Sequence, residues 1–162
     1  AVCFGVEPEI WQKAEDNQYV PETSLTETEI RMPGGHLTIA QLIALLNTIP
    51  MEITFVDVDN INRFFNEGPK DFKRPGMAID REVFSCHPPK IESTVRRIIG
   101  EFRAGALDEV PIWMDKNGKC MLVRYMAVRD KEGKYLGTLE LVQDMGFAKE
   151  HFQPEKRQEE IW

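Results

Sequence analysis

The chain has 162 residues, of which 42% are hydrophobic and 29% charged, and its formal net charge is −7. This length suits one ordinary domain, which can bury a core without a disulfide or a metal to stabilise it. The composition excludes a membrane-spanning protein and a wholly disordered one, and the negative charge argues against a broad surface for nucleic acid or anionic lipid.

The charge is unevenly distributed along the chain. Residues 1–30 hold seven acidic side chains and one basic side chain, whereas residues 31–147 hold 16 of each. A short helix is expected over 7–16, but so charged a segment buries little apolar surface, and we interpret 1–30 as an acidic linker or N-terminal extension. Residues 148–162 are expected to form a C-terminal tail. The sequence shows no secretory signal, and three scattered cysteines favour a reducing cytoplasm.

A strong helix start follows the Met32-Pro33-Gly34-Gly35 breaker. Thr38 is a good N-cap and Gln41 stands three residues later, as in a capping box, so a helix is predicted over 38–48. Its apolar positions cover more than one face. It is therefore expected to bury two sides, one against its own domain and one against a second copy of the chain. The predicted dimer-contact residues are Leu42, Ile43, Leu45 and Leu46.

The middle of the chain predicts a hairpin and a long helix. Residues 53–58 and 61–65 are β-branched and aromatic, with a turn at Asp59-Asn60 between them. Residues 66–81 are rich in Gly, Pro and charge and are expected to be irregular. A helix is predicted over 88–104, because the prolines at its start suit a first turn and an apolar stripe continues from Ile91 to Phe102.

The remaining chain predicts three strands. Alternation is clear near 110–114, 120–129 and 135–142, and Asn117-Gly118 is a strong hairpin turn. Two strands, a helical middle and three strands predict an α+β fold with a five-stranded antiparallel sheet.

This order of elements, together with several local motifs, resembles a PAS domain. The segments that carry the resemblance are MPGGHLT at 32–38, NTIP at 47–50, ITFVD at 53–57, SCHPPK at 85–90, RYMAVRD at 124–130 and YLGTLE at 135–140. It covers residues 31–147, and Cys86 to Lys90 is its most specific part. It points to the PAS subfamily that follows a hemerythrin-like domain in bacterial and archaeal proteins.

The resemblance implies a cytoplasmic, often dimeric sensory or regulatory module that is not an enzyme. It implies helices on one face of the sheet, an N-terminal flanking helix and an upstream hemerythrin-like domain in the full-length protein. A small molecule or cofactor would lie between the sheet and the helices, but the resemblance does not identify it.

Cys86 and His87 are the sharpest local feature. The functional interpretation is that His87 is the axial ligand of a haem, because imidazole binds transition metals well and haem-binding PAS relatives use a histidine from this region. The structural interpretation, which we favour, is that His87 fixes its loop through hydrogen bonds. Cys86 is interpreted as a second ligand, as a redox-sensing thiol or, preferably, as an inert buried cysteine.

Arg124 shares a strand face with apolar residues, so it is expected to point inward. A buried guanidinium needs a partner, and the alternatives are Glu140 on the neighbouring strand and an anionic ligand such as a haem propionate. Five other side chains are candidates to line a ligand cavity, with a simple core role as the alternative. They are Trp113, Tyr125, Phe55, Phe64 and Met114.

Catalytic and structural-zinc motifs are missing from the sequence. It has no nucleophile elbow, P-loop or GxGxxG, and its cysteines and histidines lack zinc-site spacing. The sequence therefore predicts a non-enzymatic sensory module that binds a ligand and dimerises. The alternatives are a haem-binding gas or redox sensor and a ligand-free protein–protein interaction module.

Overall fold

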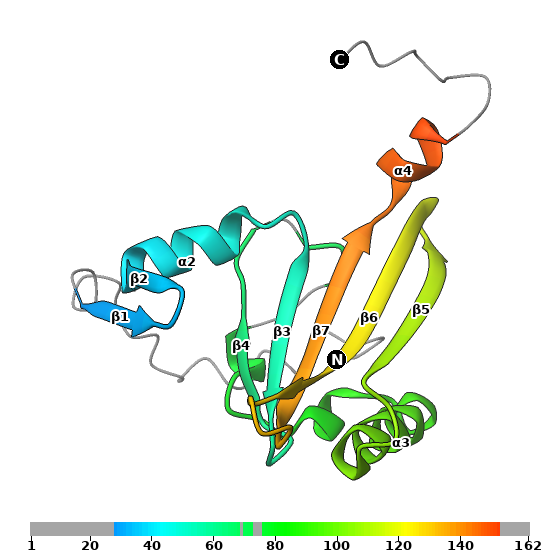
Figure 1. Ribbon diagram of the computed structural model, residues 1–162. Coiled ribbons are helices and arrows are strands. Elements are labelled where there is room, and N and C mark those ends of the chain that lie inside the picture. Colours follow the sequence, from blue (N-terminus) through cyan, green and yellow to red (C-terminus); the bar gives the residue numbers. More distant parts are fainter. Residues whose placement is uncertain (1–27, 69, 73–75, 153–162) are drawn as a thin grey trace.

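A five-stranded antiparallel sheet forms the centre of the molecule in the computed structural model, which describes residues 28–68, 70–72 and 76–152 (Figure 1). The strand order is β4-β3-β7-β6-β5. The strands are β3 (Glu52–Asp57), β4 (Asn62–Phe65), β5 (Glu109–Lys116), β6 (Lys119–Arg129) and β7 (Tyr135–Asp144). The predicted hairpins are confirmed, and so is the α+β class.

Helix α3 (Pro89–Ala104) packs against one face of this sheet. It starts at a proline, and its C-cap Gly105 adopts a left-handed φ of 75°, which glycine reaches without strain. The predicted apolar stripe is the buried face. Its buried residues are Val95, Ile98, Ile99 and Phe102.

Strand pairing sorts the sheet residues into two faces. Tyr125 pairs with Glu140, which pairs with Thr54, and this row belongs to the inner face toward α3. On the outer face, Met126 pairs with Leu139, and Leu139 pairs with Phe55. The inner rows are largely buried, whereas most outer residues are half-buried or exposed.

An N-terminal arm precedes the sheet. We define the arm as residues 29–48, which comprise β1 (Glu29–Met32), β2 (Gly35–Thr38) and α2 (Ile39–Thr48). The capping box at the start of α2 is confirmed, since Thr38 Oγ1 accepts from the Gln41 N–H and the Gln41 side chain accepts from the Thr38 N–H. The β1–β2 hairpin was not predicted, because its turn is the segment interpreted only as a breaker.

The prediction that α2 buries one side against its own domain was wrong. None of its residues is buried, and the helix projects away from the five-stranded sheet (Figure 1). The reason lies at the junction with the core, where buried Asn66 donates from Nδ2 to Leu46 O at 3.0 Å and to Met51 O at 2.9 Å. Asn66 Oδ1 accepts from the Ile53 N–H at 2.8 Å, so one side chain joins the arm to β3.

Short helices complete the described chain. The irregular segment after β4 contains η2 (Gly76–Ala78), and η3 (Val83–Cys86) precedes α3. The expected C-terminal tail begins with a helix, α4 (Gly146–His151), which directly follows β7. The helix expected over 7–16 lies outside the described residues.

Candidate functional site

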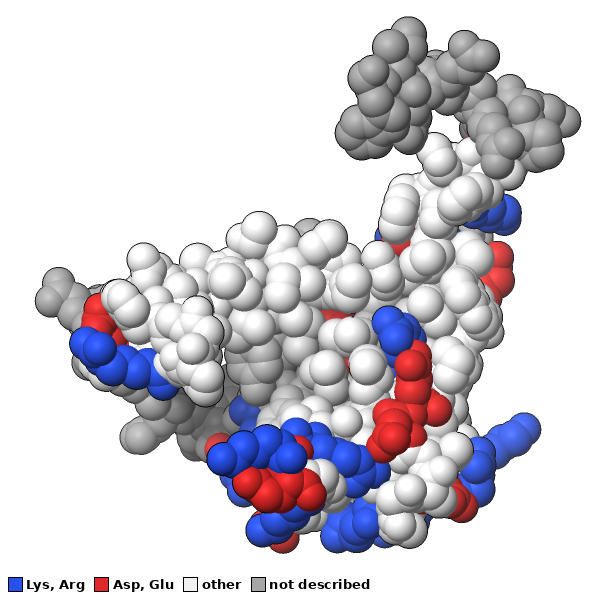
Figure 2. All heavy atoms as spheres, in the orientation of Figure 1, with Lys and Arg blue, Asp and Glu red and all other residues white. Residues whose placement is uncertain are grey.

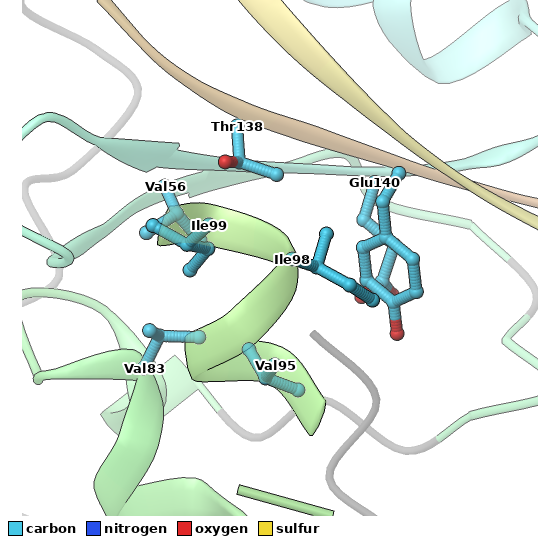
Figure 3. A pocket seen from close by; sticks show the side chains of 8 residues that line it. Val56, Val83, Val95, Ile98, Ile99, Thr138 and Glu140 are labelled. Carbon is cyan, nitrogen blue, oxygen red and sulfur yellow. The ribbon is translucent and has the colours of Figure 1, made fainter. Parts of the chain in front are cut away.

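A small cavity lies between α3, η3 and the central strands (Figure 3). Its volume is about 10 Å³, which is about the space of one water molecule. The lining residues are Val56, Val83, Val95, Ile98, Ile99, Tyr125, Thr138 and Glu140. Valine and isoleucine from α3 and η3 close one side, and the inner face of the sheet closes the other.

Two polar residues of the sheet, Glu140 and Thr138, are among those that line the mainly apolar cavity. Glu140 is 1% exposed and Thr138 is 4% exposed, both on the central strand β7. The Tyr135 hydroxyl and Thr138 Oγ1 form a hydrogen bond of 2.7 Å. A carboxyl group in an apolar interior carries a large desolvation cost, so its chemistry favours a cation or a hydrogen-bond donor beside it.

His87 is buried at the start of the α3 segment, with 7% of its surface exposed. Its Nδ1 lies 2.7 Å from Val83 O, and because a carbonyl oxygen only accepts, Nδ1 donates in this contact. This bond closes the turn made by η3 and supports the interpretation that His87 fixes the loop. The residues that line the cavity do not include His87. For Cys86 the structure describes the backbone only, at the end of η3.

Arg124 lies on the outer face of β6, and the predicted inward orientation was wrong. Its Nε donates to Glu109 Oε1 at 2.6 Å, so its partner is Glu109 and not Glu140, which lies on the opposite face. The hydrogen bond from Arg124 lowers the pKa of the Glu109 carboxyl, and the same bond raises the pKa of Arg124. The residues that share a strand face with Arg124 were predicted correctly, but this face points outward and not inward. The sequence does not show which face α3 covers, because both faces of β6 carry apolar residues.

The structure separates the other predicted lining residues. Tyr125 lines the cavity, and Met114 packs against the adjoining core cluster. Phe55 and Phe64 are a cross-strand pair on the outer face, and Trp113 is 60% exposed on β5. Glu140 and Thr138 were missed as lining residues. Their alternation with Leu139 and Leu141 along β7 could have placed them together on one face.

The comparisons with known proteins identify the family. A profile described as a PAS domain matches residues 42–146, which is more than half of the chain. The C-terminal domain of a Streptococcus mutans protein is 37% identical, with a TM-score of 0.72, over 76% of this chain and 98% of that domain. The chain therefore belongs to the PAS domain family, whose members are sensory modules that are typically not catalytic.

Other similar solved structures are more distant in sequence. A PAS domain from Colwellia psychrerythraea is 15% identical, with a TM-score of 0.47, over 65% of this chain and 95% of that one. A sensory box sensor histidine kinase from Vibrio cholerae is 12% identical, with a TM-score of 0.46, over 64% and 87% of the two chains. A search of proteins with curated functions found no significant match.

Two further findings concern the described residues alone. Within them, no group of three or more His, Cys, Asp and Glu side chains could hold a metal ion. None of the helices in the described ranges is long and apolar enough to span a membrane.

Proposed function

We propose that this PAS domain is a sensory module that binds a small molecule between its sheet and α3 and dimerises through the α2 face. The observation that supports ligand binding most directly is the cavity, where apolar α3 side chains face Glu140 and Thr138. Such a site suits a small, mostly apolar molecule.

Signalling in this proposal is a shift between two packings. The cavity of about 10 Å³ is too small for an organic ligand, so a ligand enters only when α3 or η3 moves away from the sheet. A ligand that binds the open packing better than the closed one shifts the population toward the open one. Because η3 leads directly into α3, movement of one displaces the other.

Native mass spectrometry of the purified 162-residue chain tests ligand binding. We expect a non-covalent adduct whose fraction falls at least threefold in Thr138→Val, which removes one polar group of the cavity. Thr94→Val is the matched control, because Thr94 is exposed on α3. A purified chain without any adduct would show that the ligand-binding half of the proposal is wrong.

The haem alternative does not fit the interior as it stands. The cavity has no room for a haem, and His87, which is not among the lining residues, donates from Nδ1 to Val83 O. Haem binding is tested by adding haem to the purified chain and recording the absorption spectrum. A Soret band that weakens in His87→Ala would support axial ligation, and an unchanged spectrum would remove His87 from that role.

A ligand-free interaction module is the second candidate, and the small volume of the cavity favours it. In that case, the function lies in surfaces alone, and Arg124 with Glu109 belongs to a contact face rather than to a ligand site. Dimerisation is common to both candidates. An upstream hemerythrin-like domain stays a prediction from the Cys86 to Lys90 motif, which the sequence of the full-length protein would test.

A further inference from the structure

A larger pocket lies where the arm joins the sheet. Its volume is about 350 Å³, whereas sites for small molecules enclose roughly 300 to 1,000 Å³. Its walls come from residues 47–52, from the segment that follows β4 and from the end of β7. None of the lining residues is shared with the cavity beneath α3. The pocket is therefore a second site, which has room for a small molecule while α3 stays in place.

All four charged side chains that line this pocket are acidic. They are Glu52 of β3, Glu67 and Asp71 in the segment after β4, and Asp144 of β7. At the α3 end of the molecule, by contrast, Figure 2 shows acidic and basic side chains beside one another. A hollow lined by charges of one sign concentrates ions of the opposite sign, so the pocket favours a cation.

One cation of the chain itself already contacts two of these carboxylates. Lys119 Nζ lies 2.6 Å from Asp71 Oδ1 and 3.7 Å from Asp144 Oδ2. A primary ammonium group therefore fits between a carboxylate of the loop and a carboxylate of the sheet. Glu67, in contrast, is exposed, and its carboxylate has no hydrogen-bond or ion-pair partner in the described part of the chain. The lining thus holds two carboxylates that accept an ammonium group and a third that is available to a ligand.

The dispersed carboxylates favour an organic cation over a metal ion. Among the described residues, no group of three or more His, Cys, Asp and Glu side chains could hold a metal ion, so the acids of this pocket do not converge on one small ion. Ile49, Pro50, Met51 and Val142 add apolar surface to the walls. A methylene chain gains from contact with such a surface while the charged groups at its ends stay with carboxylates or water, as they do in lysine side chains.

We propose that the pocket binds a short aliphatic diamine, with one ammonium group at Glu67 and the other replacing the ammonium group of Lys119. The bound diamine contacts residues 47–51, at and just after the end of the arm, together with the loop after β4 and the end of β7. It therefore limits the movement of the arm against the sheet. Neither ligand binding beneath α3 nor dimerisation is needed for this site, so its failure would leave the proposed function untouched.

Isothermal titration calorimetry of the 162-residue chain with 1,4-diaminobutane tests the proposal. We expect one site per chain and an affinity about tenfold higher than for butylamine, because only the diamine brings a second charge-assisted hydrogen bond. Magnesium chloride at the concentration of the diamine should not displace it. Absence of binding, equal affinity for the two amines, or displacement by magnesium would overturn the proposal.

Two pairs of variants separate the pocket from a general attraction of cations to a chain of net charge −7. Glu67→Gln should lower the affinity about fivefold, whereas Glu132→Gln, which removes the same charge from the exposed β6–β7 turn, should leave it unchanged. Lys119→Gln should raise the affinity, because its ammonium competes for the same carboxylates, whereas Lys131→Gln in that turn should not. Equal changes within a pair would overturn the proposal. Each pair tests the site by itself, so if circular dichroism shows one variant to be unfolded, the other pair decides.

Discussion

Helices α2 and α3 show that apolar content alone does not determine burial. The sequence of α2 carries no charged side chain, yet none of its residues is buried. The sequence of α3 carries six charged residues, yet four of its apolar residues are buried in the core. The difference lies in arrangement, because α3 presents one narrow stripe to the sheet, whereas α2 is apolar on several sides and is attached to the core at one end only.

The largest expected effect on the free energy of unfolding comes from a substitution in the core. Phe102 is fully buried beneath the sheet, and Phe102→Ala should lower the free energy of unfolding by about 4 kcal/mol, because it removes a large side chain and leaves a cavity. The matched control Phe147→Ala, at a side chain that is 65% exposed on α4, should change it by less than about 0.5 kcal/mol. Urea denaturation measures both. Equal losses would contradict a core centred on α3.

The junction between arm and core should give the next largest effect. Asn66→Ala leaves the buried Ile53 N–H and the half-buried Leu46 O and Met51 O without their side-chain partner. Unsatisfied buried groups cost about 1 to 3 kcal/mol each, so a loss of about 3 kcal/mol is expected in urea denaturation. Asn47→Ala is the control, since it removes one exposed bond. A loss no larger than that of the control would mean that Asn66 does not fix the arm.

A substitution at the N-cap of α2 should destabilise that helix only. Thr38→Ala removes the hydroxyl of the capping box and should destabilise the helix by about 1 kcal/mol. Hydrogen exchange should then be faster by about fivefold in α2 and unchanged in α3. The same acceleration in both helices would contradict the picture of the arm as a separate unit.

The smallest effect concerns the ion pair on the outer face. The hydrogen bond from Arg124 holds the Glu109 pKa below its usual value, so the pair stabilises the fold above that value and this contribution is lost as the pH falls through the lowered pKa. Arg124→Gln should raise the Glu109 pKa in an NMR titration. Because both groups are solvent-exposed, the melting temperature should hardly change. An unchanged Glu109 pKa would show that the pair is absent in solution.

Local sequence patterns were sufficient to predict the features of the fold that depend on neighbouring residues. The strands, the capping box at Thr38 and the buried stripe of α3 followed from alternation, capping and helical spacing. The inward direction expected for Arg124 did not hold, since alternation separates two faces but does not say which one a helix will cover. Gly137 also gave no signal, although a Cβ there would collide with Val56 O across the β3–β7 pair.

The sequence did not predict that α2 projects away from the sheet, for a related reason. Asn66 lies in a segment expected to be irregular, and three of its side-chain hydrogen bonds join positions that are far apart in the sequence. Long-range hydrogen bonds of one polar side chain produce no periodic pattern in the sequence. Glu140 and Val83, which are also far apart in the sequence, line the same cavity because η3 folds over the sheet.

The chain enters and leaves the five-stranded sheet at the same end. Glu52, the first residue of β3, pairs with Val142 near the end of β7, so α2 arrives and α4 departs on neighbouring strands (Figure 1). A domain with this geometry can be inserted into a surface loop of another protein without forcing the two flanking segments apart. It also means that a small slide of β3 along β7 would change the distance between α2 and α4.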